Sequence, residues 1–217
     1  MSITQNLLEL KQELPRDVTL VAVSKTRPVA DLMEAYEAGQ RIFGENKIQE
    51  MAEKQQQLPG DVAWHMIGHV QSNKVKAMAA FVDLIHGVDS LGLLKEINRQ
   101  AGKHNRVIYC LLQIHIAEEE TKFGLDEEEL TILLESEEIK ELKNIRLRGL
   151  MGMATFTEDQ EQLRKEFSHL KNIFEGCRGG NPDFEILSMG MSGDYKLAIA
   201  CGSTMVRVGS RIFGVRK

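Results

Sequence analysis

The sequence is poor in cysteine and proline, and it has neither a long apolar run nor an excess of basic charge. Its three cysteines, Cys110, Cys177 and Cys201, form no C-x-x-C pair. This argues against a disulfide framework or a zinc site and favours reduced thiols in a cytoplasmic protein. The polar N-terminal segment lacks the apolar core of a secretory signal, and no run approaches the roughly 20 residues of a membrane span. The formal net charge of −5 argues against nucleic acid and anionic membranes as partners.

Domain boundaries and nucleotide-binding signatures are missing as well. The four prolines are spread over positions 15, 28, 59 and 182, and no Pro/Gly/Ser-rich linker divides the chain. Neither the phosphate-loop pattern GxxxxGK[ST] nor GxGxxG after a strand occurs. With 42% hydrophobic and 27% charged residues, the composition is that of an ordinary globular protein. We therefore expect a single domain over residues 1–217.

What the sequence does contain is an alternation of short apolar runs with longer amphipathic stretches. The first run is continuously apolar, as in a parallel strand that is buried on both faces. The runs predicted as strands are Val18–Ser24, Arg41–Gly44, Ala63–Gly68, Leu84–Gly87, Val107–Ile114, Leu147–Met151, Phe184–Ser188 and Met205–Val208. The stretches predicted as helices are Val29–Ala38, Lys47–Gln57, Asn73–Ala80, Leu91–His104, Glu127–Ser136, Gln160–Phe174 and Tyr195–Ala200. Leucines at 7, 8, 10 and 14 indicate an extra N-terminal helix that ends before Pro15.

This alternation predicts an α/β protein with parallel strands covered by helices. Eight units in one chain favour a (β/α)8 TIM barrel with an extra N-terminal helix, and an open doubly wound sheet is the alternative. In such barrels the functional groups come from the carboxyl ends of the strands. The residues that follow each predicted strand are therefore the first place to look for a site.

Lys25 directly follows the first predicted strand. At the mouth of an apolar barrel, desolvation would lower the pKa of this lysine and free its amine to attack a carbonyl group. A solvated surface lysine at the end of a strand is the ordinary alternative, and position alone favours it. The case for a functional lysine therefore depends on what lies beside it.

The loops after the last two predicted strands could provide a phosphate-binding site near Lys25. Ser188–Asp194 is rich in glycine and precedes a predicted helix, and Gly209-Ser210 follows strand eight. Backbone N–H groups in these places suit a phosphate, although Gly, Ser and Asp are also ordinary turn residues. Closing the barrel would bring strand eight beside strand one. An amine next to a phosphate cradle fits a phosphorylated aldehyde, for which pyridoxal phosphate is the obvious cofactor.

Other residues that could carry chemistry give weaker signals. His65 and His69 have a zinc-like spacing, but they flank the end of a predicted strand, so we expect no metal site. Cys110 falls inside an apolar strand and is expected in the core. The methionines at 151, 153, 189 and 191 are expected to line the barrel, where they could also form a soft wall for a flat ring.

Seven sequence blocks together resemble one family. They are VAVSKT at 21–26, FGEN at 43–46, WHMIGHVQSNK at 64–74, TKFG at 121–124, GLMGMAT at 149–155, SMGMSGD at 188–194 and STMVRVGSRIFG at 203–214. In this order they resemble the pyridoxal phosphate homeostasis proteins, a single-domain family similar to the N-terminal barrel of alanine racemase. The resemblance covers nearly the whole chain, and the combination of blocks carries it.

The resemblance implies a role for each of several residues. Lys25 is similar to the lysine that holds pyridoxal phosphate as an internal aldimine. Asn46 looks like a residue beside the ring of the cofactor. Arg207 resembles the arginine that faces the pyridine nitrogen in this fold.

The resemblance also implies a phosphate cradle. Ser192 and the backbone around Gly209 and Ser210 look like the groups that hold the phosphate, and Met191 would line the pocket beside them. Ser210 stands where the family often has threonine, and both residues supply a hydroxyl group. The loop that contains His69-Val70 departs from the expected Gly-x-Leu-Gln-Ser-Asn-Lys, which leaves the role of this loop open.

The resemblance implies a cytoplasmic carrier or buffer of pyridoxal phosphate with little catalysis of its own. A charged Arg207 beside the ring nitrogen would disfavour its protonation and weaken the cofactor as an electron sink. The chain also ends soon after strand eight, without the second domain that supplies an opposing base in alanine racemase. A carrier implies apo forms of pyridoxal-phosphate enzymes as partners, and we expect a monomer or weak dimer.

Two alternatives stay open from the sequence. A racemase or a related enzyme would need a second acid or base from His69, Tyr195 or a partner chain. A regulatory protein that senses the cofactor would instead form a complex that depends on cofactor loading.

Overall fold

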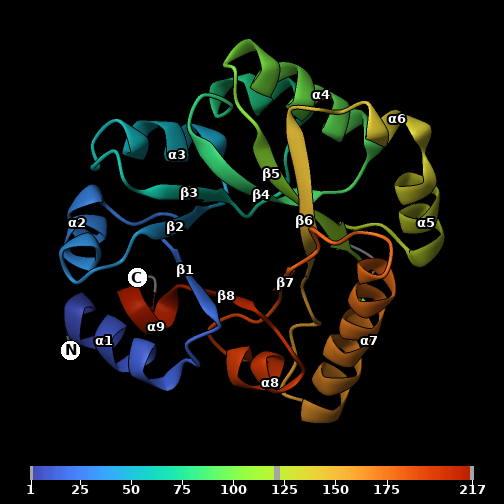
Figure 1. Ribbon diagram of the computed structural model, residues 1–217. Helices are drawn as coiled ribbons and strands as arrows, with labels where there is room; N and C mark the ends of the chain where they lie inside the picture. The colour runs from blue at the N-terminus through green and yellow to red at the C-terminus, as the bar shows by residue number, and fades with distance from the viewer. Residues whose placement is uncertain (1, 120–122, 216–217) are drawn as a thin grey trace.

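The computed structural model describes residues 2–119 and 123–215. Eight parallel strands, β1 to β8, pair in sequence order, and β8 pairs with β1 to close a barrel. Figure 1 shows this ring of strands with helices around its outer side. The predicted TIM-barrel class is therefore confirmed, and the open doubly wound sheet is excluded.

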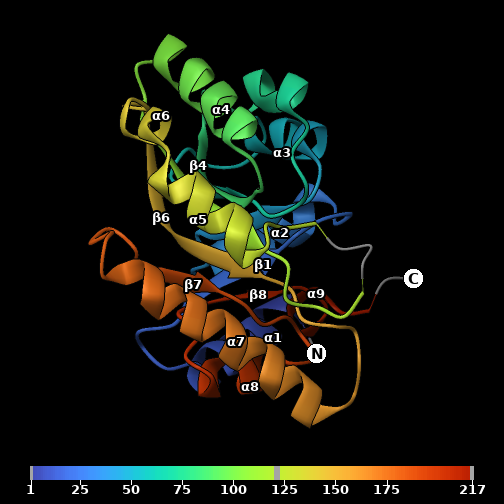
Figure 2. The ribbon, with the colours of Figure 1, turned by 90° about the vertical axis from the view of Figure 1, so that its right-hand side faces the viewer.

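Each of the eight predicted apolar runs forms one strand of the barrel. The strands are β1 Thr19–Val23, β2 Ile42–Glu45, β3 Ala63–Met66, β4 Val82–Val88, β5 Ile108–Ile114, β6 Ile145–Gly152, β7 Ile186–Ser188 and β8 Met205–Val208. The α-helices are α1 Ile3–Glu13, α2 Val29–Glu37, α3 Ile48–Gln55, α4 Leu91–Lys103, α5 Glu127–Glu135, α6 Glu137–Lys140, α7 Gln160–Arg178, α8 Tyr195–Ala200 and α9 Ser210–Phe213. Figure 2 turns α5, α6 and α7 towards the viewer.

The main differences from the predicted helices lie in four places. The segment predicted as a helix over Asn73–Ala80 forms a short 3₁₀ helix, η1 Ser72–Ala77. Helices α6 and α9 were not predicted, because four residues are too few to show a helical period. Helix α7 continues four residues beyond its predicted end at Phe174.

The predicted N-terminal helix α1 lies outside the barrel, next to the last helix of the chain (Figure 1). The side-chain amide of Asn6 donates to the carbonyl oxygen of Ile212 in α9 at 3.0 Å. On its other side, Thr4 donates from its backbone N–H to the carboxylate of Glu34 in α2 at 3.0 Å. Helix α1 thus covers the seam where the two ends of the chain meet. None of the helices within the described ranges is long and apolar enough to cross a membrane.

Apolar side chains form two separate layers. The larger one, which includes Phe43 and Phe167, fills the space between strands and helices. The smaller one fills the inside of the barrel and consists of Val21, Leu84, Leu111, Met151 and Met205, with Met153 packed against it. Cys110 is fully buried in the outer layer, as predicted.

The expected lining role is wrong for Met189. Its side chain belongs to the outer layer, because successive side chains of an extended segment point to opposite faces. Ser188, which precedes it, contacts side chains inside the barrel instead.

Candidate functional site

The pairing of β1 with β8 decides where the candidate site lies. Val21 is paired with Arg207 and Ala22 with Val208. Gly209 directly follows β8, and a Cβ atom added to this glycine would lie 3.1 Å from the carbonyl oxygen of Val23. The two backbones are therefore close together. Lys25, half-buried, follows two residues after Val23. The predicted pairing of strand one with strand eight is therefore confirmed, and it brings the backbone before Lys25 close to the loop after strand eight.

Lys25 sits in a tight turn with unusual backbone geometry. The N–H of Arg27 donates to the carbonyl oxygen of Ser24 at 3.0 Å and closes the turn. Thr26, directly after the lysine, has a φ of 65°. A β-branched residue in this left-handed region is strained, and such strain costs about 1–3 kcal/mol. The surrounding structure must therefore hold the turn in place.

A buried charged cluster lies directly against this turn. Lys54 in α3 donates from its Nζ to the carbonyl oxygen of Ser24 at 2.8 Å and to Oε1 of both Glu45 and Glu50 at 2.7 Å. Glu50 also accepts the backbone N–H of Thr26, and Glu45 accepts the hydroxyl of Ser24 at 2.7 Å. This cluster was not predicted from the sequence. Its one signal, the i,i+4 spacing of Glu50 and Lys54, is also that of an ordinary surface ion pair.

The pKa values of the two carboxylates of the cluster shift in opposite directions. Burial raises the pKa of Glu45, while hydrogen bonds from Lys54 and Ser24 oppose this shift. For Glu50, burial also acts to raise the pKa, but the hydrogen bonds from Lys54 and from the N–H of Thr26 outweigh it, so that this pKa is lowered. Glu45 is fully buried, and its Oε2 atom has no hydrogen-bond partner among the described residues.

The two loops predicted to hold a phosphate are joined by a hydrogen bond. The backbone N–H of Gly209 donates to the Oγ of Ser192 at 3.1 Å. The carboxylate of Asp194 accepts the N–H of Met191 and shapes the same loop. Helix α9 begins at Ser210, where the first backbone N–H groups have no acceptor within the helix. Ser192, Gly209 and Ser210 therefore lie together at the end of β8 that faces the Lys25 turn.

Asn46 lies on the other side of Lys25. Val23 and Gly44 are paired between β1 and β2, and Lys25 and Asn46 each follow this pair by two residues. A Cβ atom at Gly68 would lie 2.5 Å from the carbonyl oxygen of Asn46, so only glycine lets the two backbones come this close. The half-buried Asn46 is thus fixed at the mouth of the barrel beside the lysine.

Arg207 lies inside the barrel, where its side chain is almost completely buried. Its Nη1 donates to the backbone oxygen of Ser188 at 2.8 Å and to the Oγ of Ser188 at 2.6 Å. Its Nη2 donates to the carbonyl oxygen of Gly152 at 3.0 Å. Burial lowers the pKa of Arg207 to about 10, so the guanidinium stays charged at neutral pH.

A chain of polar side chains leads from Arg207 across the barrel. The Oγ of Ser188 is 3.1 Å from Nδ1 of His86, and Nε2 of His86 is 3.1 Å from Nδ1 of His65. Burial lowers the pKa of His65 to about 3. The pKa of His86 is lowered well below its usual value, chiefly by burial and further by the charges of His65 and Arg207. Both imidazoles are therefore neutral at pH 7. This chain of side chains was not predicted from the sequence, although His86 interrupts an apolar strand.

The two side chains considered as a second acid or base are engaged elsewhere. Tyr195 donates its hydroxyl to Glu13 in α1 at 2.7 Å, and burial together with this hydrogen bond raises its pKa to about 12. This places its hydroxyl on the outer side of the barrel. The ring of His69 stacks on Phe123, with ring centroids 4.1 Å apart, and its Nδ1 is 3.5 Å from Asp89. The first two residues of the TKFG block lie outside the described residues.

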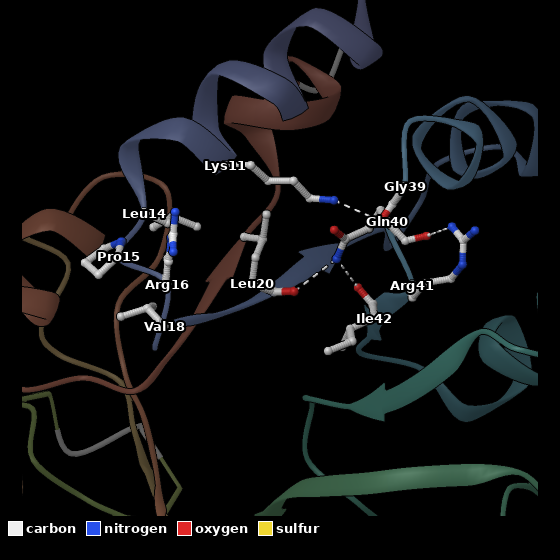
Figure 3. A pocket seen from close by; sticks show the side chains of 10 residues that line it. All are labelled: Lys11, Leu14, Pro15, Arg16, Val18, Leu20, Gly39, Gln40, Arg41 and Ile42. Carbon is white, nitrogen blue, oxygen red and sulfur yellow. Dashed lines mark hydrogen bonds between the residues drawn. The ribbon is translucent and has the colours of Figure 1, made fainter.

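A cavity of about 360 Å³ lies at the amino ends of β1 and β2, away from Lys25 (Figure 3). The side-chain amide of Gln40 donates to the carbonyl oxygens of Leu20 and Ile42, and Lys11 donates to that of Gly39 at 2.9 Å. The guanidinium of Arg41 contacts Asp61. Lys11 thus joins α1 to the loop before β2, and Gln40 joins this loop to β1 and β2.

The comparisons with known proteins agree with this geometry. The chain matches the alanine racemase N-terminal domain family over residues 1–217. It also resembles the structure of alanine racemase from Enterococcus faecalis, of which it covers 58% at 16% identity and a TM-score of 0.78. This likeness establishes a common fold. The protein thus belongs to the class of barrels represented by the N-terminal domain of alanine racemase.

Closer relatives define the family further. A pyridoxal phosphate homeostasis protein of Pasteurella multocida is 38% identical over 100% of this chain and 98% of its own length. The one of Escherichia coli K12 is also 38% identical, over 93% of this chain and 87% of its own. PipY of Synechococcus elongatus is 37% identical and covers 98% of this chain, with TM-scores of 0.93 without and 0.90 with bound pyridoxal phosphate. The chain belongs to the pyridoxal phosphate homeostasis protein family.

The neutral, buried histidines predict a loss of stability in weak acid. Unfolding restores an ordinary pKa of about 6.5, so below this pH the unfolded state binds protons that folded His65 does not. The free energy of unfolding should therefore fall by about 2 kcal/mol for His65 alone between pH 7.5 and 5. Urea denaturation at these two pH values measures the fall. The fall in the free energy of unfolding should be smaller in His65→Asn and equal to the wild-type value in the exposed control His104→Asn. Equal falls in all three proteins would show that His65 does not cause the loss of stability.

Proposed function

We propose that the protein binds pyridoxal phosphate reversibly through Lys25 and acts as a carrier or buffer that keeps the free cofactor at a safe level. The observation that carries the proposal is the β1–β8 pairing, which sets the Lys25 turn against Gly209 and the linked Ser192. The solved structure of a relative in the same family with pyridoxal phosphate bound supports it. The three free cysteines fit action in the reducing cytoplasm.

The residues at the site match the chemical groups of this cofactor. Pyridoxal phosphate supplies an aldehyde, which bonds reversibly to an amine with release of water, and a phosphate dianion. Lys25 offers the amine. Ser192 offers a hydroxyl donor and Ser210 a hydroxyl and a backbone N–H of the kind that bind phosphate, and the N–H of Gly209 holds the two loops together by donating to Ser192. The close approach of Gly209 to Val23 keeps this cradle beside the lysine.

The other proposed binding residues orient the cofactor. Asn46 lies next to Lys25 at the mouth, and the half-buried Met191 belongs to the same loop as Ser192. Arg207 has five N–H donors, of which the hydrogen bonds found among the described residues use three. The remaining donors of this fixed guanidinium can face the ring nitrogen of the cofactor.

The site favours holding and exchange of the cofactor over catalysis. The charge of Arg207 disfavours a second positive charge on the ring nitrogen, which weakens the electron sink that carbanion chemistry needs. Tyr195 and His69 are engaged with other side chains. The relatives are named for homeostasis and not for a reaction. A carrier of this kind would deliver its load to apo forms of pyridoxal-phosphate enzymes as a monomer or weak dimer.

The attachment residue can be tested by covalent trapping. Protein loaded with pyridoxal phosphate and reduced with borohydride should carry a pyridoxyl group on Lys25, because this amine alone follows β1 beside the phosphate cradle. Peptide mass spectrometry locates the label, and Lys25→Ala should lose it. A label on Lys74 or Lys122 alone would show that the assignment is wrong.

The phosphate cradle can be tested by comparing two ligands. Ser192→Ala removes a hydroxyl from the cradle, and losing a hydrogen bond to a charged group costs about 1.5–3 kcal/mol. Binding of pyridoxal phosphate should therefore weaken by one to two orders of magnitude, while binding of pyridoxal, which has no phosphate, should hardly change. Titration followed by absorbance measures both affinities, with the exposed Ser168→Ala as control. Equal weakening for the two ligands would place the phosphate elsewhere.

The proposed lack of catalysis can be tested by isotope exchange. Loaded protein incubated with L-alanine and other amino acids in deuterated water should exchange their α-protons negligibly, while it transfers cofactor to an apo-enzyme. Proton NMR follows the exchange, and recovered enzyme activity follows the transfer. Turnover in the ordinary enzyme range of roughly 1–1000 per second would instead identify an enzyme.

A further inference from the structure

We propose that Glu45, Glu50 and Lys54 form an ionic clamp that positions Lys25 by holding the 24–27 turn in its strained conformation. The inference rests on the proposed function, in which Lys25 is the attachment residue. The three clamp residues are positioning residues, because Glu50 and Lys54 contact the backbone of the turn and Glu45 contacts the hydroxyl of Ser24. They come from β2 and α3, and the turn itself follows β1.

The clamp binds the turn on both sides of Lys25. Before the lysine, the carbonyl oxygen of Ser24 accepts from Lys54, and the hydroxyl of Ser24 donates to Glu45. After the lysine, the N–H of Thr26 donates to Glu50. The residue between these two anchor points therefore has little freedom to change its backbone direction, which sets where its side chain begins.

The strained residue is the one that the clamp holds through its backbone N–H. Thr26 has its φ of 65° in a region that threonine avoids and that asparagine adopts several-fold more often. Without the bond to Glu50, the turn would relax towards a conformation that threonine prefers. The amine of Lys25 would then be displaced from the loops at Gly209 and Ser192.

Lys54 is suited to the clamp and not to binding an aldehyde. Its three acceptors use all three N–H groups of the ammonium. Its residue is only 5% exposed, whereas Lys25 is half-exposed. The two lysines at this strand end therefore have different roles: Lys54 is a structural cation, and Lys25 is the attachment residue.

Glu50 offers the cleanest way to test the clamp. Replacing Lys54 would leave Glu45 buried without its cation and endanger folding, whereas the Glu50 side chain is 22% exposed. Glu50→Ala removes the acceptor of the Thr26 N–H, and Glu50→Gln keeps an acceptor but no charge. Glu53→Ala, at an exposed position of the same helix, is the matched control. Thr26→Asn combined with Glu50→Ala supplies a residue that accepts the left-handed conformation by itself.

The experiment measures two properties of each variant. The first is the rate constant at which pyridoxal phosphate attaches to Lys25, followed by absorbance. The second, measured without cofactor, is the hydrogen-exchange protection of the Thr26 amide. We expect Glu50→Ala to lower the attachment rate at least tenfold and the protection clearly, Glu50→Gln to lie between, and Glu53→Ala to match the wild type. Thr26→Asn in the Glu50→Ala background should restore most of the rate.

The outcomes separate this inference from the proposed function. If Lys25 is trapped by borohydride in the wild type but Glu50→Ala attaches cofactor at an unchanged rate, the clamp is overturned and the function stands. A slower Glu50→Ala that Thr26→Asn does not rescue also overturns it, because the effect then does not act through the turn. If Lys25 is not the trapped residue, the proposed function fails, while a loss of Thr26 protection in Glu50→Ala would still support the clamp on the turn.

Discussion

The pairing of β1 with β8 is the interaction on which the candidate site depends. These strands come from opposite ends of the sequence, and only their hydrogen bonds bring Lys25 next to Gly209 and Ser192. The same closure gives α1 its place against α9, outside the seam. A barrel without this pair would keep its other strand neighbours, but it would hold the amine and the phosphate-binding loops apart.

The inside of the barrel combines an apolar layer with one chain of polar groups. Burying a guanidinium without partners would be very costly, and Arg207 is held by oxygen atoms of Ser188 and Gly152. His86 and His65 continue the chain without adding charge, because burial keeps both neutral. The result is a guanidinium held in a fixed orientation inside the barrel. Such an arrangement suits the role proposed for Arg207, which is to act electrostatically on the ring nitrogen of the cofactor.

Environment distinguishes the two lysines near the end of β1. Lys54 lies between two carboxylates and a backbone oxygen, so its charge is neutralised and its hydrogen-bonding capacity is filled. Lys25 occupies a strained turn at the half-exposed mouth. Strain of this kind persists only where neighbouring groups over-determine the backbone, and it is found most often at functional sites. In the proposed clamp, Lys54 thus supports the turn that carries the proposed attachment residue, Lys25.

Much of the fold and the central part of the site could be predicted from the order of residues. Continuous apolar runs such as Val18–Ser24 indicate buried parallel strands, and eight of them with intervening helices favour a barrel. Barrel topology then places Lys25 beside the loop at Gly209 without further information. The loops at 188–194 and 209–210 were predicted as a phosphate site from barrel topology, whereas the individual roles of Asn46, Met191, Ser192 and Arg207 came from family resemblance, and all these binding roles remain proposals.

Other features arise only when distant segments meet in three dimensions. Glu50 and Lys54 have the spacing of a solvated helical pair, and packing of α3 against the end of β1 buries them against the turn. His65, His86 and Ser188 are single polar residues in separate strands, and the closed barrel joins them to Arg207. Local sequence thus determined which segments are strands and helices, because periodicity depends on neighbouring residues. The tertiary structure decided which polar groups share a buried environment, because burial and hydrogen bonding depend on residues far apart in the chain.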